Sequence, residues 1–371
     1  MKHIKRYIRF FAIVANLLCV ALLLLTAYSP HIHPTLHPVA SCLGLVFPLL
    51  LLLNLGFVLF WVLTLQFKWL LIPLVGIAAC WPQVRTYIPL NTHKKELPAD
   101  CIKLLTYNIM GFDGITKDKA GNNPILDYLV ASKADILCLQ EYRTSSSSKY
   151  LTQADVEQAL KAYPYHNIQD IGSQRGHTNR IACYSKFPIL SARKLDLESS
   201  YNGSVMYEIV LQGDTVTLIN NHLESNKLTK ADKVVYEEIL AAPGQTEQVK
   251  SGARLLIGKL AEASVIRAVQ ADSVARQVKT SRHPYVIVCG DFNDTPISYT
   301  HRVIARGLKD AFAESGQGPG ISFNQNKFYF RIDHILTSRN FRAYNCTVDR
   351  SINVSDHYPM WCYLEKKRIT P

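Results

Sequence analysis

Polar side chains that could do chemistry follow several apolar, strand-length runs in the part of the chain after residue 100. Each comes where the run ends, and strand ends are where side chains from different strands can converge. The residues are, in chain order, Asn108, Gln140, Glu141, His222, Asp291, Asn293, Asp333, Asp356 and His357. One such residue alone is usually a turn former or a helix cap. Their recurrence at the end of one run after another indicates a common site.

Three of these residues have the oxygen donors that a hard divalent cation prefers. Magnesium takes few carboxylates and keeps several water molecules, so Glu141, helped by Asp356 and Asn108, could hold it. A cation in this position would neutralise the phosphate group during hydrolysis of a phosphoester. The sequence therefore predicts a Mg²⁺ site formed by these residues.

The other residues in the set could manage the water and the phosphate. Asp291 could orient or deprotonate the attacking water, and Asn293 could hold the phosphate. His222 and His357 could donate hydrogen bonds from either side. A histidine that must stay protonated and oriented needs a carboxylate behind it, and Asp333 is the candidate for His357. Together these residues predict hydrolysis of a phosphoester.

The same segments resemble the endonuclease/exonuclease/phosphatase superfamily, over roughly residues 100 to 365. The matching motifs are Tyr-Asn at 107–108, Leu-Gln-Glu-Tyr at 139–142, Asn-His-Leu at 221–223, Gly-Asp-Phe-Asn-Asp at 290–294, Arg-Ile-Asp-His-Ile at 331–335 and Ser-Asp-His at 355–357. Each motif alone is weak or moderate evidence, whereas the set in this order is strong. The resemblance implies a DNase-like four-layer fold.

The resemblance also implies that Glu141 binds the catalytic Mg²⁺ or Mn²⁺, with Asn108 and Asp356 nearby. It implies that Asp291 and Asn293 manage the nucleophile and the phosphate. It further implies that His222 and His357 flank the scissile group and that Asp333 supports His357. In one respect the chain departs from the family. Some DNA-repair members carry an acidic residue two positions after the first asparagine, where this chain has Met110. That weakens an interpretation as an abasic-site nuclease and leaves the core chemistry unaffected.

Two further residues are candidates for substrate binding. Arg143 follows Glu141 by two positions and could contact a substrate phosphate, although a surface arginine is an equal alternative. Asn179 begins the segment 179–188, which looks like the family's strand leading into a Ser-Lys-x-Pro turn. A structural role is the first interpretation for that segment, and Asn179 could also face the site.

The pattern of apolar runs predicts an α/β domain. Strands are expected at 102–107, 136–139, 181–184, 205–211, 216–220, 285–289, 332–336 and 360–364. Helices are expected at 124–132, 154–162 and about 247–278. So many strands, several of them reading as hairpins, favour two packed, mostly antiparallel sheets flanked by helices, an α/β/β/α sandwich. The polar, Lys-rich stretch 224–248 is interpreted as an insertion over or beside the site, which could act as a mobile lid.

The first 90 residues differ sharply in composition from the rest. They hold six of the 41 Lys and Arg residues and none of the 29 Asp and Glu residues, although the whole chain has a net charge of +12. No charged residue lies between Arg9 and Lys68, and about 20 apolar residues suffice to span a bilayer as a helix. We expect a bundle of two to three transmembrane helices at about 10–28, 39–67 and 69–88, a linker at 91–100, and a catalytic domain at 101–371.

The third span is the weakest, because Pro73, Pro82 and Arg85 interrupt it. A cleavable signal peptide is the alternative for the first, and the further apolar segments count against it. The basic N-terminus indicates a cytoplasmic start. Three spans would then place the catalytic domain outside the cytoplasm, and two would place it inside.

The histidines and cysteines outside these motifs give weaker signals. His31, His33 and His37 are separated by prolines and indicate an interfacial loop in preference to a metal tract. The nine cysteines are dispersed, which makes zinc unlikely and free thiols the first expectation, with a Cys346–Cys362 disulfide as the alternative.

These observations predict a membrane-tethered, divalent-metal-dependent phosphodiesterase. Its partners would be a phosphodiester substrate, either a nucleic acid or a lipid head group, and the lipid bilayer; no protein partner can be inferred. A phospholipid or sphingolipid phosphodiesterase, or a phosphomonoesterase of the same fold, is the alternative. A protein that binds a partner without catalysis is a more remote one. Outside the first 90 residues the charge excess is mild, at 35 basic against 29 acidic residues, so it is no nucleic-acid signature.

Overall fold

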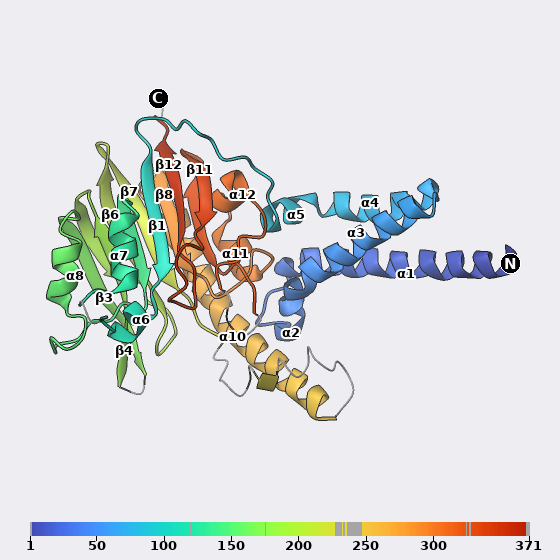
Figure 1. Cartoon of the computed structure of the whole chain (residues 1–371), viewed down its shortest axis with the longest axis horizontal. Helices are drawn as coiled ribbons and strands as arrows, with labels where there is room; N and C mark the ends of the chain where they lie inside the picture. The colour runs from blue at the N-terminus through green and yellow to red at the C-terminus, as the bar shows by residue number, and fades with distance from the viewer. Residues whose placement is uncertain are drawn as a thin grey trace.

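The computed structural model describes residues 2–118, 121–174, 176–226, 232, 234–235, 247–323, 325 and 328–368. Two six-stranded sheets pack face to face, and helices cover their outer faces. A helical unit extends from one side of this sandwich (Figure 1). We call residues 2–88 the N-terminal helical unit and the rest the catalytic domain. The predicted four-layer sandwich is confirmed.

The first sheet has the strand order β11-β12-β1-β2-β4-β3. Its strands are β1 (Ile102–Asn108), β2 (Ile136–Gln140), β3 (Tyr165–Gln174), β4 (His177–Ser185), β11 (Phe341–Val348) and β12 (Met360–Lys366). Only the neighbours β1 and β2 run parallel. Helices α7 (Pro124–Ala131) and α8 (Gln153–Ala159) belong to the layer that covers its outer face.

The second sheet has the order β5-β6-β7-β8-β10-β9. Its strands are β5 (Ile189–Lys194), β6 (Gly203–Leu211), β7 (Asp214–His222), β8 (Tyr285–Asp291), β9 (Leu308–Asp310) and β10 (Asp333–Ser338). Only β7 and β8 run parallel. Its outer face is covered by the long helix α10 (Glu247–Lys279) and by α11 (Tyr299–Ile304). The predicted helices at 124–132, 154–162 and 247–278 are confirmed to within a few residues.

The core explains why the sequence signal was clear for some strands and absent for others. β1, β2 and β8 are buried along nearly their whole length, so their sequences are continuous apolar runs. β5 is an edge strand with mostly exposed side chains, and β3 is rich in polar residues. These two strands, together with β9 and β11, were not predicted. The short helices α11 and α12 (Ala311–Ser315) and the irregular turn labelled α6 (Met110–Ile115) were also missed.

The N-terminal helical unit contains the segments α1 (Lys2–Tyr28), η1 (Ser29–His31), α2 (Pro38–Ser41), η2 (Cys42–Val46), α3 (Phe47–Leu63), α4 (Phe67–Ala79) and α5 (Trp81–Tyr87). Two helical stretches, Arg6–His31 and Pro38–Leu63, are long and apolar enough to cross a membrane. The third predicted span is a pair of helices, α4 and α5, that meet at an angle of 68°. The break lies at Cys80, while Pro73 is accommodated inside α4 and Pro82 in the first turn of α5.

The N-terminal helical unit packs directly on the catalytic domain. Leu23, Phe47, Leu51 and Tyr87 form a buried cluster with Ile297 of the catalytic domain. Gly44 lies so close to that residue that a Cβ atom there would be 1.8 Å from the carbonyl oxygen of Ile297. Only glycine permits this approach. The two units therefore share a closely packed interface.

Arg331, a residue of the catalytic domain, stabilises the same interface. Its guanidinium group is fully buried and donates hydrogen bonds to the backbone carbonyls of Thr86, Tyr87 and Pro319. The group also lies 4.3 Å from the ring centroid of Phe312. Because Arg331 is two residues before Asp333, the end of α5 is tied to the start of the strand that carries a candidate site residue.

The structure bears on the smaller predictions to different extents. All nine cysteines lie in the described part of the chain and are free, so the Cys346–Cys362 disulfide is absent there. The interfacial loop at His31, His33 and His37 stays a prediction; His33 Nε2 lies 3.4 Å from Asp272, and the His33 ring packs against Tyr299. The predicted lid at 224–248 lies for the most part outside the described residues.

Candidate active site

The ends of four strands bring the candidate residues together between the two sheets. In the second sheet, Asp291 on β8 is paired with His222 on β7 and with Asp333 on β10. In the first sheet, Asn108 ends β1. Its side-chain Nδ2 donates to Asp291 Oδ2 at 3.1 Å, which joins the two sheets at this point. The strand-end pattern seen in the sequence thus corresponds to one buried site.

Asp333, His357 and Asp291 form a connected set. His357 Nδ1 lies 2.8 Å from Asp333 Oδ2, and His357 Nε2 lies 3.6 Å from Asp291 Oδ2. All three residues are buried. Burial by itself would lower the pKa of His357, but the carboxylates of Asp333 and Asp291 outweigh it and hold that pKa well above its usual value. Burial raises the pKa of Asp291, and the charge on His357 opposes that rise.

His222 lies on the other side of Asp291, and its pKa is shifted in the opposite direction from that of His357. Asn179 Nδ2 lies 3.1 Å from His222 Nδ1 and also donates to the carbonyl of Tyr201. An amide N–H facing Nδ1 makes that nitrogen the acceptor, so the proton of a neutral ring is on Nε2. Nε2 lies 3.7 Å from Asp291 and from Glu141. Burial lowers the pKa of His222, which agrees with a neutral ring.

Glu141 and Asp356 provide oxygen atoms on the more open side of the site. Asn108 turns its Nδ2 toward Glu141, and its Oδ1 accepts a hydrogen bond from the backbone N–H of Met110 at 3.2 Å. The Glu141 side chain is 34% exposed, and its Oε1 accepts a hydrogen bond from Asn108 Nδ2 at 3.1 Å. The backbone of Glu141 has a φ of 55°, an uncommon value for a residue other than glycine, and such conformations cluster at functional sites. Burial raises the pKa of Glu141, the bond from Asn108 opposes the rise, and the negative charge of Asp356 adds to it.

The donor set fits a divalent cation. Four carboxylates, those of Glu141, Asp291, Asp294 and Asp356, line one cavity, and Arg267 is the one Lys or Arg side chain among its described lining residues. Clustered carboxylates repel one another unless a cation or protons compensate their charge. The donors are oxygen atoms, which Mg²⁺ and Mn²⁺ prefer over softer ligands.

Asn293 lies in the turn that follows β8. Its backbone N–H donates to Asp291 Oδ1 at 2.8 Å, and its Nδ2 donates to the carbonyl of Leu223 at 2.9 Å. Its φ is 52°, so this turn too is held in a left-handed conformation. Asn293 lines the cavity, while its side chain also holds the Asp291 turn against the end of β7.

Contact between Arg143 and a substrate phosphate stays a prediction. Arg143 is not among the described residues that line the cavity. Its guanidinium group lies against the backbone of Gly111, and the Nε atom is buried without a hydrogen-bond partner. Asn179 is likewise absent from the described lining and contacts His222 instead.

The site opens into a cavity of about 460 Å³. Its polar part contains the candidate residues Asn108, Glu141, His222, Asp291, Asn293, Asp356 and His357. Its apolar part contains side chains from the N-terminal helical unit, from α10 and from the loops before α11 and β10, namely Pro34, Leu45, Val46, Leu256, Leu260, Ile297, Phe323, Phe328, Phe330 and Ile332.

Sequence reasoning missed this apolar part, because its residues are brought together only by tertiary packing. It also missed Ser322 and Ser355. Ser322 Oγ accepts from the backbone N–H of Asp333 at 3.1 Å, and Ser355 Oγ donates to the carbonyl of Asn108 at 2.7 Å. The Ser-Asp-His motif contained Ser355, but a hydroxyl bonding to a distant strand leaves no local signal.

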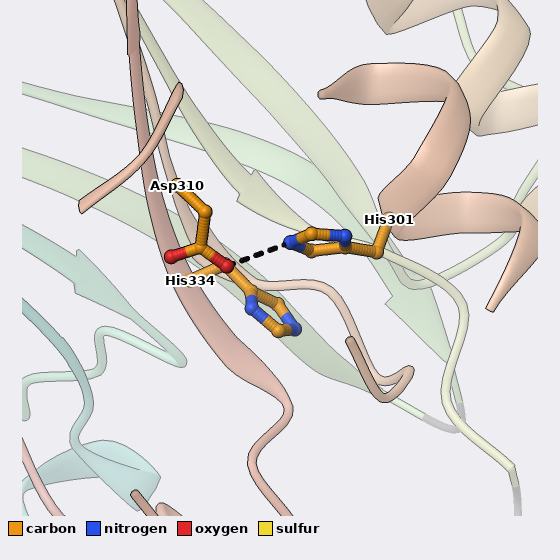
Figure 2. A group of neighbouring side chains, drawn as sticks. All are labelled: His301, Asp310 and His334. Carbon is orange, nitrogen blue, oxygen red and sulfur yellow. Dashed lines mark hydrogen bonds and ion pairs between the residues drawn. The ribbon is translucent and has the colours of Figure 1, made fainter. Parts of the chain in front are cut away.

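A second group of chemistry-bearing side chains lies on the opposite side of β10, where His301, Asp310 and His334 converge (Figure 2). His301 Nε2 lies 3.0 Å from Asp310 Oδ2, and His334 Nε2 donates to the carbonyl of Asp294 at 2.9 Å. Asp310 Oδ1 caps α12 by accepting two backbone N–H groups. Burial would raise the pKa of Asp310, but the hydrogen bond from His301 and the positive charge of His301 outweigh burial and hold that pKa well below its usual value. These buried hydrogen bonds connect β10, the strand that carries Asp333, to the segment that contains Asp294, and they connect His301 to Asp310 on the neighbouring strand β9.

Comparison with models of known protein families shows which family this chain belongs to. A model of the Endonuclease/Exonuclease/phosphatase family matches residues 105–357. The chain belongs to this family. It is therefore a hydrolase acting on ester bonds of the phosphoester type. Residues 8–87 match a second family, which is described only as a domain of unknown function, DUF8431. No curated protein sequence matches the chain.

Solved structures of the endonuclease/exonuclease/phosphatase fold are similar to this chain at low identity. An endonuclease/exonuclease/phosphatase from Beutenbergia cavernae DSM 12333 is 16% identical, with a TM-score of 0.50 and 72% of each chain covered. The human Nocturnin catalytic domain with bound sulfate is 14% identical, with a TM-score of 0.49, covering 75% of this chain and 97% of that one. The Neisseria 3′ phosphatase NExo bound to a product DNA hairpin is 18% identical, with a TM-score of 0.45, covering 72% of this chain and 100% of that one. The first similarity supports the fold.

Proposed function

We propose that this family member is a membrane-tethered, divalent-metal-dependent phosphodiesterase. The observation that carries the proposal is the convergence of Asn108, Asp291 and His357 from separate parts of the chain. Asp291 Oδ2 lies 3.1 Å from the Asn108 amide and 3.6 Å from His357 Nε2. An acceptor, a donor and a group of oxygen ligands then face one cavity, which is the arrangement that water attack on a phosphoester requires.

Each residue of the site has its own role in the proposed reaction. A divalent cation held by Glu141 and Asp356, with Asn108 beside it, would neutralise the negative charge of the phosphate. Asp291 accepts a proton from the attacking water, whose oxygen forms a bond to phosphorus. The bond from phosphorus to the leaving-group oxygen then breaks, and that oxygen takes a proton from His357 or from a water molecule. The products are a phosphomonoester and an alcohol.

The two histidines flank the phosphate with N–H donors. The raised pKa of His357 keeps it protonated, so its Nε2–H can donate to a phosphate oxygen or to the leaving group. Asp333 fixes the ring orientation through Nδ1. His222 donates from Nε2 because Asn179 occupies Nδ1. Asn179 therefore acts as a positioning residue.

Membrane tethering is supported by the N-terminal helical unit. Its large apolar side chains are exposed, including Phe11, Leu52, Leu63 and Val75, and a soluble protein would not leave such a surface in water. The N-terminus and the turn between α3 and α4 lie at the far end of the unit, while α1 and α5 end beside the catalytic domain (Figure 1). This favours three crossings and a catalytic domain on the side of the membrane opposite the N-terminus.

A direct test uses the full chain in detergent or vesicles. It should hydrolyse the soluble diester bis(4-nitrophenyl) phosphate with Mg²⁺ or Mn²⁺. A C-terminal reporter that is active only in the cytoplasm should remain silent if there are three spans. A signal from that reporter would leave the chemistry intact and overturn the three-span topology.

A further inference from the structure

The cavity of the candidate active site has one wall that the N-terminal helical unit supplies. Pro34, Ser41, Cys42, Leu45 and Val46 all line it. The side chains of Ser41 and Ser264 lie 3.3 Å apart, so α2 contacts α10 beside the cavity. The N-terminal helical unit, which is proposed to enter the bilayer, therefore lines the same cavity as Asp291 and His357.

The lining changes from polar to apolar within this one space. Glu141, Asp291 and His357 lie on the polar side, and Leu45, Leu256 and Leu260 lie on the apolar side. The two sides meet at His357, whose ring packs edge-on against Phe323 with centroids 5.2 Å apart. An amphiphilic molecule matches such a lining, with its phosphate on the polar side and its hydrocarbon on the apolar side.

The apolar wall continues onto the surface. Val46 lines the cavity and is 44% exposed. Leu255 on α10, next to the lining residue Leu256, is 54% exposed, and Val39 and Ile257 are exposed as well. Helix α10 projects past the sheets on the side from which α1, α3 and α4 extend (Figure 1). Exposed apolar side chains beside membrane-spanning helices mark a surface that contacts lipid.

The charge of the cavity argues against a nucleic acid. Arg267 is the one Lys or Arg side chain among the described lining residues, beside the carboxylates of Glu141, Asp291, Asp294 and Asp356. Arg267 already donates to the carbonyl of Glu224 and to Asn226, and pairs with Asp294 at 3.5 Å. A nucleic-acid groove instead neutralises several successive phosphates with basic residues.

We infer that the substrate is a membrane lipid phosphodiester whose hydrocarbon chain lies between η2 and α10 and whose phosphate faces Asp291 and His357. This inference rests on the proposed function and specifies its substrate class. Water adds to the phosphorus atom, the phosphoester bond to one alcohol breaks, and that alcohol leaves with a proton. The lipid enters from the bilayer side, past Val46.

The test compares three substrates with the full-length protein and Mg²⁺ or Mn²⁺. They are dioleoyl-phosphatidylglycerol vesicles, the soluble diester bis(4-nitrophenyl) phosphate, and single-stranded DNA. The variants Val46→Asp and Leu260→Asp place a charge on the apolar wall. They should lower the ratio of the lipid rate to the soluble-diester rate by at least about tenfold, because an apolar contact is replaced by a charge. The control Val130→Asp, on an exposed position of α7, should leave the ratio unchanged.

An equal loss on both substrates in the wall variants, or faster hydrolysis of DNA than of lipid by the wild type, would overturn the inference. Hydrolysis of the soluble diester but not of the vesicles would also overturn it, while the proposed function would stand. Failure on all three substrates would remove the proposed function itself.

A second readout does not depend on turnover. The Asp291→Asn variant in vesicles with a phosphatidylglycerol that carries a photoreactive acyl chain should be labelled at Leu256 or Leu260, which lie outside the membrane-spanning helices. Labelling confined to the N-terminal helical unit would contradict the lipid site.

Discussion

Nδ1 of His357 lies 2.8 Å from Oδ2 of Asp333, and both side chains are buried at the end of the second sheet. Because Nδ1 faces the carboxylate, Nε2 is turned toward Asp291. Asp333 thus orients the ring, with Nε2 toward the place where the phosphate would react. Burial lowers the pKa of His357, but the negative charges of Asp333 and Asp291 outweigh it and raise that pKa.

The first prediction concerns this pair. Asp333→Asn removes the negative charge that holds the proton on His357, while keeping the size of the side chain. We expect kcat for a soluble diester to fall by roughly 10²–10⁴-fold, the range associated with a positioned acid or base. Steady-state kinetics of the full-length protein measure the effect. A kcat within twofold of the wild type would show that the orientation of His357 is not important.

The second prediction concerns Asn179, whose amide lies 3.1 Å from His222 Nδ1. Asn179→Ala frees that nitrogen, so the proton of the His222 ring is no longer confined to Nε2. We expect kcat to fall about 10–100-fold, as for other residues that orient a functional histidine. The control Asn122→Ala changes an exposed loop residue and should have no effect. Equal activity of the two variants would exclude a positioning role for Asn179.

The third prediction concerns Arg331 and the docking of the N-terminal helical unit. Arg331→Ala leaves the carbonyls of Thr86, Tyr87 and Pro319 without their buried donor. The loss should destabilise the protein by about 3 kcal/mol or more, since each buried polar group left unpaired costs about 1–3 kcal/mol. Thermal unfolding in detergent measures this. Arg339→Ala, an exposed change in the turn after β10, is the control and should shift the midpoint little. Equal midpoints for the two variants would contradict the assigned role of Arg331.

The fourth prediction is a pH dependence of stability. The pKa of Asp310 is depressed in the folded protein by its contact with His301. Its contribution is therefore fully present above the unfolded pKa, about 3.9, and is lost as the pH falls toward the lower folded value. The unfolding midpoint of the wild type should drop on acidification below about pH 4. Asp310→Asn should be less stable at neutral pH and should lose part of that drop. An identical acid profile for wild type and variant would disprove this linkage.

Much of the fold could be predicted from the sequence because the buried strands are continuous apolar runs. β1, β2 and β8 were recognisable for this reason, and the residues at their ends carried the family motifs. β3 and β5 escaped because their exposed, polar faces leave no apolar periodicity. The bend at Cys80 between α4 and α5 could not be located either, because Pro73 and Pro82 lie on its two sides and each could break a helix.

The candidate site shows the same division. Asp291, Asp333 and His357 were identified by type and motif, and they lie together. Asn179 was predicted to be structural or to face the site, and its contact with His222, a residue 43 positions away, could not be foreseen. Val46 lies beside the site because residues far apart in the sequence pack together, and a local sequence pattern does not predict such contacts.

The most direct test of the central claim measures hydrolysis of bis(4-nitrophenyl) phosphate by the full-length protein, with Mg²⁺, with Mn²⁺, and with EDTA. The account predicts turnover with at least one of the two metals, none in EDTA, and none in Asp291→Asn under any condition. Turnover that survives EDTA, or an Asp291→Asn variant as active as the wild type, would contradict it.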